Sequence, residues 1–191
     1  MFPDRPQGLS GKTALEKTLM AEIHGPPELR RREKQLLLGQ FRERVIKALT
    51  FEQVAEPGTY PEIRQAIKHT DAKKLIVSRK ADLAAAADYI NLARKQGLAF
   101  STVDQPDFRG NIALVVAAKD AVEEQEVFIP TRSEKLASRG IPAEIIISPG
   151  RRLCSSCRSL LAAKAPEELI NYPSAKWYSL FVRERCPCGK S

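Results

Sequence analysis

The stretch GQFRERVIKALT, Gly39–Thr50, decides how the fold is interpreted, because it fits two kinds of secondary structure. As a helix, it places Phe41, Val45 and Ala48 on one face. As a strand, its side chains alternate between two faces from Arg44 to Leu49. A helical pattern precedes the stretch, and a mixture of helix and strand patterns follows it. We therefore expect Arg44–Leu49 to be the first strand of a sheet.

Upstream of this stretch, the sequence predicts an arm and two helices. Residues 1–12 are rich in Pro and Gly, which is typical of an arm. Thr13 and Glu16 have the spacing of a capping box and predict the start of a first helix. Gly25-Pro26-Pro27 then breaks the chain, and a basic helix is expected over Glu28–Leu38. Its cations are expected to be solvated, with contact to nucleic acid as the alternative.

Downstream, helical patterns alternate with short apolar runs. Helices are expected over Tyr60–His69, capped by Thr59, and over Leu83–Lys95, capped by Asp82. The expected strands are Lys74–Val77, Ala99–Val103, Asn111–Ala118 and, at an edge, Glu126–Ile129. Such alternation with short connections predicts an α/β fold, with a partly parallel sheet covered by helices.

The remaining residues depart from this pattern. Pro130–Gly150 is expected to be a linker with a helical turn at Glu134–Ser138 and a strand at Glu144–Ser148. The tail that follows has a helix-like stretch up to Ile170. An alternating pattern over Lys176–Arg183 then predicts a strand.

Composition restricts the class of protein. With 191 residues, 43% of them hydrophobic, the chain can form one core domain with an appendage, or two small domains. No apolar run approaches the length of a transmembrane helix, and the first residues lack the apolar core of a signal peptide. We expect a cytoplasmic protein that does not enter the membrane.

The net charge of +8 is concentrated at the two ends. Lys and Arg exceed Asp and Glu by 10 to 6 in residues 1–50 and by 8 to 3 in residues 150–191, whereas residues 51–149 hold 13 against 14. Basic ends indicate a polyanionic partner such as RNA or DNA. The alternative is that the surplus cations only keep the protein in solution.

Four cysteines form the clearest chemical pattern. Cys154 and Cys157 form a CxxC motif, and Cys186 and Cys188 form a CxC motif 28 residues further on. Two such pairs of thiolates can complete a tetrahedral shell, so we predict a Zn²⁺ site that resembles a small zinc ribbon. Ribbons usually have CPxC in the second position, where this chain has CxC. An iron–sulfur cluster, a redox dithiol and free thiols are the alternatives.

Cations and aromatic side chains accompany these cysteines. On nucleic-acid surfaces, cations meet phosphates and rings stack on bases. For Trp177 and Phe181, the alternative is a small core of the tail itself. The expected nucleic-acid-binding residues are Arg151, Arg152, Arg158, Lys176, Trp177, Arg183, Arg185 and Lys190.

Patterns typical of catalysis are weaker. His24 and His69 lie far from the cysteines in sequence, and acidic pairs such as Asp104 and Asp107 sit among expected turns. The GxSxG elbow of hydrolases is absent from the sequence. We predict no catalytic residue and expect a protein that acts by binding rather than as an enzyme.

Six segments within residues 20–129 also occur together in a known family. They are His24–Leu29 (HGPPEL), Leu38–Val45 (LGQFRERV), Ala48–Thr50, Tyr89–Gly97, Ile112–Val115 and Glu126–Ile129. In these segments, of which LGQFRERV is the most specific, the chain resembles the YueI-like family of small bacterial cytosolic proteins. The resemblance implies an α-β-α sandwich related to the fold of kink-turn-binding ribosomal proteins. Those proteins bind RNA through a helix start that contains Gly and Asn, and here Thr59–Glu62 occupies that place, so the RNA-binding signature is absent.

Together these features predict the organisation of the chain. We expect an arm and helix at residues 1–24, an α-β-α sandwich with a mixed sheet at 25–130, a linker at 131–150 and a Cys-rich basic tail at 151–191. The favoured function is a non-enzymatic binding protein for structured RNA or the ribosome, with a structural Zn²⁺ site. The alternatives are a protein–protein adaptor that uses the tail, and a thiol redox protein that uses the CxxC pair.

Overall fold

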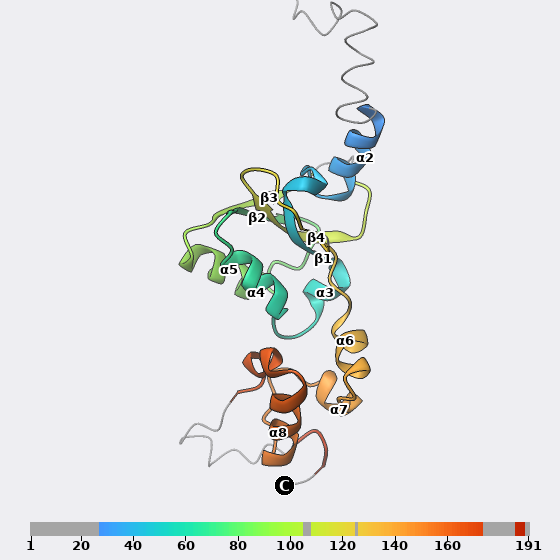
Figure 1. Ribbon diagram of the computed structural model, residues 1–191, viewed down its shortest axis with the longest axis vertical. Helices are drawn as coiled ribbons and strands as arrows, with labels where there is room; N and C mark the ends of the chain where they lie inside the picture. Colours follow the sequence, from blue (N-terminus) through green and yellow to red (C-terminus); the bar gives the residue numbers. More distant parts are fainter. Residues whose placement is uncertain (1–26, 105–107, 125, 174–185, 190–191) are drawn as a thin grey trace, which may run out of the picture.

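A computed structural model describes residues 27–104, 108–124, 126–173 and 186–189 of the chain. Its shape is elongated, with a sheet between helix α2 (Pro27–Leu36) on one side and helices α4 (Pro61–Ile67) and α5 (Ala87–Lys95) on the other (Figure 1). The expected first helix at Thr13, Asp107 with its expected turn, and the expected strand at Lys176–Arg183 lie outside the described residues.

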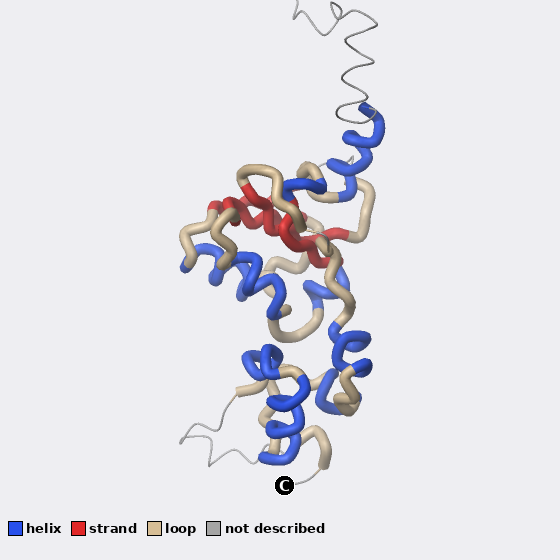
Figure 2. Tube along the Cα trace, in the orientation of Figure 1, coloured by secondary structure: helices blue, strands red, loops and turns tan. Residues whose placement is uncertain are grey.

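The sheet has four strands in the order β1-β4-β2-β3. These are β1 (Val45–Thr50), β2 (Ala72–Ser78), β3 (Ala99–Val103) and β4 (Ile112–Ala118), drawn in red in Figure 2. Strand β4 runs antiparallel to both of its neighbours, whereas β2 and β3 are parallel. The predicted α/β fold with a mixed sheet is confirmed.

The ambiguous stretch Gly39–Thr50 forms mainly a strand. A short 3-10 helix, η1 (Arg42–Arg44), leads into β1, and Ala48 pairs with Val115 of β4. The strand ends at Thr50, whose side chain accepts a hydrogen bond from Gln53 N at 3.2 Å while Thr50 N donates to Gln53 Oε1 at 2.9 Å. This capping box starts helix α3 (Phe51–Ala55) directly after the strand.

Both faces of the sheet are covered, as expected for short apolar strands. On one face, Ile46 and Leu49 of β1 join a core that includes Ile63 of α4 and Tyr89 of α5. On the other face, Val45 and Ala48 pack with Leu37, Leu38 and Val127. Every residue of β4 is buried as a result.

Two helix starts differ from the expectation. The residue before α4 is Tyr60, with no side-chain cap, and the Thr59 hydroxyl donates to Asn171 Oδ1 at 3.4 Å instead of accepting from the first turn. Asp82 does accept the N–H of Ala84 at 2.8 Å, as a cap would. The residues after it form turns, and α5 begins only at Ala87.

Two expected strands are wrong in part or in full. Glu126–Ile129 forms only an isolated parallel bridge between Phe128 and Ala48, where Ala48 N donates to Val127 O at 3.0 Å. The pairing goes no further, since Thr50 N donates to Gln53 Oε1 and Ile129 O accepts from Gln53 Nε2 at 2.7 Å. Glu144–Ser148 is not a strand, because Ala143–Ile146 forms helix α7. Helical periodicity buries Ile145 and Ile146 and leaves Ile147 74% exposed.

Residues 131–173 and 186–189 form what we call the C-terminal unit. It contains α6 (Arg132–Ser138), α7, α8 (Ser155–Lys164) and the 3-10 helix η2 (Pro166–Asn171). These elements share a core, so the segment expected as a linker contributes α6 and α7 to it; the core members are Leu136, Ile141, Ile145, Ile146, Leu161, Ala165 and Tyr172. Within the described parts of the chain, no helix is long and apolar enough to cross a membrane.

Candidate metal centre

The CxxC motif lies at the beginning of helix α8. Cys154 occupies the N-cap position, and Cys157 lies within the first turn, so both thiols are on the same side of the helix end. Buried Leu161 and half-buried Leu160 attach α8 to the core of the C-terminal unit, and Cys157 packs against the same core. The first cysteine pair is therefore held by a folded element rather than by a loop.

The CxC motif forms a tight turn. Gly189 N donates to Cys186 O at 2.9 Å, which closes a four-residue turn over Pro187 and Cys188. Proline fits the second position of such a turn. Gly189 follows with a φ of +75°, which a side chain would disfavour.

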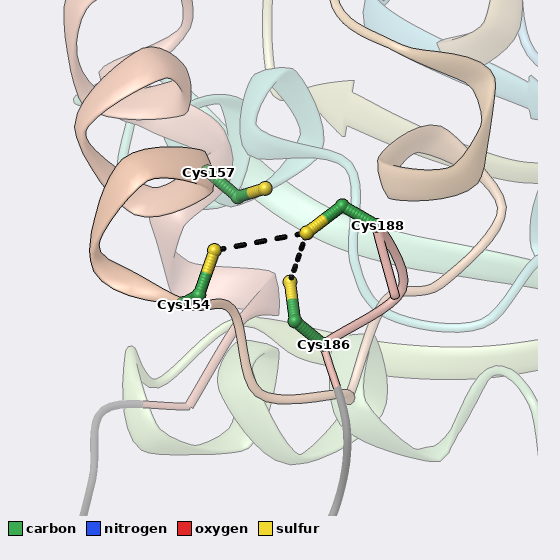
Figure 3. A group of neighbouring side chains, drawn as sticks. All are labelled: Cys154, Cys157, Cys186 and Cys188. Atoms are coloured by element: carbon green, nitrogen blue, oxygen red, sulfur yellow. Dashed lines mark hydrogen bonds between the residues drawn. The ribbon is translucent and has the colours of Figure 1, made fainter. Parts of the chain in front are cut away.

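These two elements bring all four sulfur atoms together (Figure 3). The Sγ atoms lie within 4.8 Å of one another. Cys154 Sγ is 3.8 Å from Cys188 Sγ, which is 3.4 Å from Cys186 Sγ. Zinc–sulfur bonds of about 2.3 Å in a tetrahedron place the sulfurs about 3.8 Å apart. The four cysteines can therefore hold a metal ion with small adjustments of their side chains.

The helix end affects the first pair unequally. The backbone N–H of Cys157 and the Cys157 thiol face Cys154 and lower its pKa to about 6. Burial raises the pKa of Cys157, and hydrogen bonds to the neighbouring thiols add to the rise. A bound cation would favour the thiolate form of both residues, since metal binding releases thiol protons.

The centre departs from a zinc ribbon in one respect. A ribbon carries each cysteine pair on a turn between strands, whereas here the CxxC pair begins a helix. Among the described residues, only the turn at Cys186–Gly189 has the form of a ribbon knuckle.

Three of the eight expected nucleic-acid-binding residues lie in the described part of the chain. Arg151 is exposed, and Arg152 and Arg158 are half-buried beside the CxxC motif. Arg158 NH1 donates to Tyr172 O at 3.3 Å. The remaining five lie outside the described residues; they are Lys176, Trp177, Arg183, Arg185 and Lys190.

A polar junction between the C-terminal unit and the α/β domain was missed from the sequence. We define it by Thr59, Arg132, Lys135, Glu168 and Asn171. Arg132 is 2% exposed and Glu168 is fully buried, and Arg132 Nε lies 3.4 Å from Glu168 Oε2. Glu168 also accepts from Lys135 Nζ at 2.7 Å and from Asn171 Nδ2 at 2.8 Å.

The amide of Asn171 completes this junction. Its Oδ1 accepts from Thr59 N at 2.8 Å, and its Nδ2 donates to Thr59 O at 2.8 Å. The two residues are 112 positions apart, so no local sequence signal could have indicated their pairing. The charge of Arg132 is further balanced by Glu56, 3.3 Å away, and lies over the ring of Tyr60.

Comparisons with known proteins relate the α/β domain to one family. The model of a family described as "Protein of unknown function (DUF1694)" matches residues 12–128. The uncharacterized protein YueI of Bacillus subtilis (strain 168) is 31% identical over 111 residues, which is 58% of this chain and 84% of YueI. The crystal structure of the B. subtilis YueI protein matches with a TM-score of 0.52 at 28% identity, over 60% of this chain and 91% of that one. The four cysteines lie beyond the residues that the family model matches.

Proposed function

Since the chain belongs to the DUF1694 family of proteins of unknown function, we propose a function from its own residues, namely binding without catalysis. In this proposal, a structural Zn²⁺ ion organises the C-terminal unit, and that unit binds structured RNA or the ribosome. The observation that carries the proposal is the convergence of four cysteine sulfurs within 4.8 Å from α8 and a distant turn.

Zinc is the metal that this ligand set favours. Four thiolates and near-tetrahedral spacing are typical of structural zinc sites, and such sites hold segments together that have little core of their own. Here the turn at Cys186–Gly189 contributes one buried side chain, Cys186, with 7% exposure. Reduced thiolates of this kind persist in a reducing compartment, which agrees with a cytoplasmic location.

Elemental analysis of the untagged protein, purified without chelator, tests the metal. We expect about one zinc per chain, as for other four-thiolate structural sites. The double variant Cys154→Ser/Cys188→Ser should lose the metal, whereas Ser155→Ala, an exposed position in the same motif, should retain it. Iron in place of zinc would indicate a cluster on the same ligands, and absence of any metal would contradict the proposal.

RNA binding is supported by charge at the same end of the molecule. The excess of Lys and Arg over Asp and Glu in residues 150–191 is 8 to 3, and Arg151, Arg152 and Arg158 lie beside the cysteine motif. A surface of this kind neutralises phosphates and releases counterions. Affinity for RNA should therefore fall steeply with salt.

Fluorescence anisotropy with a structured RNA at several salt concentrations measures this dependence. If the three described arginines each neutralise one phosphate, log K should fall with log salt at a slope of about −2 to −3 or steeper. Arg151→Gln should reduce the slope by about one. Lys73→Gln, an exposed cation on the α/β domain, should leave it unchanged. Binding that does not respond to salt, or no RNA recovered after crosslinking in cells, would contradict RNA binding.

An adaptor function is the second candidate, favoured by exposed apolar side chains on the same unit. Ile147 is 74% exposed and Ile170 is 50% exposed. An adaptor would bind its partner with weak dependence on salt, and Ile147→Asp would weaken that binding.

A redox function requires the CxxC thiols to react freely in the native protein, so unchanged thiol reactivity with and without a chelator would favour it over zinc.

A further inference from the structure

A polar cleft lies where the α/β domain meets the C-terminal unit. Its volume is about 620 Å³, within the range of small-molecule sites. One wall is formed by α4 and α5, and the other by Pro149-Gly150 and the end of η2. The cleft is thus separate from the cysteine centre, and its two walls come from the two parts of the molecule.

Four polar side chains on the α-helical wall are available to a ligand. They are Arg64 of α4 and Asp88, Asn91 and Lys95 of α5. In the described part of the chain, none of the four makes a hydrogen bond or ion pair. The three residues of α5 follow one another at intervals of three and four positions, so they lie along one face of that helix.

The floor of the cleft is fixed in place. Thr59 is bound through both backbone groups to the amide of Asn171. Gly58, with a φ of +83°, allows this close approach, because an added Cβ would lie 2.8 Å from Asn171 Oδ1. The neighbouring polar groups are therefore satisfied internally, in contrast to those of the helical wall. A preformed floor lowers the cost of ordering the site around a ligand.

Apolar surface accompanies the polar groups. Half-buried Leu92 lies on the helical wall, and the side chain of Ile170, 50% exposed, lies on the opposite wall. The cleft thus offers two cations, one carboxylate, one amide and an apolar contact on each side.

We propose that this cleft binds a nucleoside monophosphate. Arg64 and Lys95 pair with the phosphate, since guanidinium and ammonium groups are the usual partners of phosphate oxygens. Asp88 accepts and Asn91 exchanges hydrogen bonds with ribose hydroxyls, and the base packs against Leu92 and Ile170. Asp88 would repel a simple anion, and Arg64 and Lys95 would repel a cation. A ligand that combines a phosphate with hydroxyl groups engages both kinds of side chain.

Isothermal titration calorimetry of the full-length protein tests the site. The probes are the four ribonucleoside 5′-monophosphates, inorganic phosphate and unphosphorylated adenosine. At least one monophosphate should bind about ten-fold more tightly than phosphate or adenosine, because only it engages both groups of side chains. If no probe gives a saturable signal at concentrations of about 10 mM, where even weak complexes form, the proposal is overturned.

Substitutions place the binding in the cleft. Arg64→Gln and Lys95→Gln should each weaken the monophosphate by about ten-fold. Lys68→Gln, an exposed cation at the end of α4 that does not line the cleft, is the matched control and should change nothing. Lys95 is exposed, so its substitution leaves the fold intact. Equal effects of Lys68→Gln and Lys95→Gln would overturn the assignment.

A second set of titrations identifies the source of the monophosphate. A 5′-phosphorylated RNA oligonucleotide that binds more tightly than the free monophosphate, and loses this advantage in Arg64→Gln, indicates the end of an RNA chain. Equal or weaker binding indicates a free nucleotide. None of the four cysteines lines the cleft, so a failure of nucleotide binding in the metal-loaded protein counts against the cleft alone, whereas the elemental analysis tests the metal.

Discussion

The pairing of Asn171 with Thr59 predicts a large and specific loss of stability in Asn171→Ala. The substitution removes the partners of the Thr59 N–H and C=O, which lie 2.8 Å from the amide, while Thr59 is only 6% exposed. Each buried backbone group left without a partner costs about 1–3 kcal/mol, so the two together cost about 2–6 kcal/mol. Asn171 lines the cleft, where water can reach the vacated space, so we expect the lower part of this range, about 2–4 kcal/mol.

Urea denaturation followed by far-ultraviolet circular dichroism measures this loss. With a slope of about 2 kcal/mol per molar urea, the midpoint should fall by about 1–2 M. Asn91→Ala is the matched control, because Asn91 lines the same cleft but is exposed. Its free energy of unfolding should change by less than about 0.5 kcal/mol.

Asn171→Asp separates hydrogen bonding from packing. The variant keeps an acceptor for the Thr59 N–H, loses both donor contacts and places a carboxylate beside fully buried Glu168. It should be at least as unstable as Asn171→Ala at neutral pH. It should recover part of the lost stability in acid, where the carboxyl introduced at position 171 is protonated. If Asn171→Ala unfolds at the same urea concentration as Asn91→Ala, the pairing does not hold the two parts together.

Three further predictions concern the same region. Gly58→Ala should destabilise the protein by about 1–3 kcal/mol in urea denaturation, because the positive φ of Gly58 and its approach to Asn171 both oppose a side chain. Gly97→Ala, at a φ of +72° with open space around it, should cost less. Equal losses would contradict the role of the contact between Gly58 and Asn171. Arg132→Met should cost about 3 kcal/mol, since it leaves buried Glu168 with fewer partners, and a melting temperature equal to that of the unsubstituted protein would refute this. Burial raises the pKa of Tyr60 and Tyr89, and that of Tyr172 to about 12, above the usual value of 10.0. Because the folded state holds these protons more tightly, their contribution to stability is complete below pH 10 and is lost as the pH rises toward the folded pKa values. The phenolate absorbance of these three tyrosines should therefore appear together with unfolding in alkali, and their full ionisation in a folded protein at pH 10 would contradict this prediction.

The sheet was predictable where local pattern and burial agree. The apolar runs at Lys74–Val77 and Asn111–Ala118 are strands because both faces of the sheet are covered, which a continuous apolar run requires. Thr50 and Gln53 form a capping box that the sequence displays, and it indicates why the strand stops where it does. The spacing of the four cysteines likewise predicted that their side chains would meet.

The errors arose where tertiary contacts outweigh local preference. The run of isoleucines at 145–147 has strong strand propensity, yet the core around Tyr172 accepts it as a helical turn; Tyr172 OH donates to Ile145 O at 2.6 Å. Thr59 is a good helix cap by residue type, but its hydroxyl and both of its backbone groups bind the Asn171 amide. Apart from the local contact between Glu168 and Asn171, the polar junction joins residues that lie 33 to 112 positions apart, so single-sequence patterns contain no trace of those contacts.

The place of β4 in the sheet has a consequence for how the chain assembles as it is synthesised. Strand β4 is the last of the four in sequence, yet it separates β1 from β2, and Val45 pairs with Ala117. Until residues 112–118 have left the ribosome, β1 lacks its partner strand β4, and the backbone groups of β1 that bond to β4 remain unpaired. The parallel unit β2-α5-β3 can form earlier, because its parts are contiguous. We therefore expect slow translation between residues 50 and 118 to prolong the time during which a nascent molecule can aggregate.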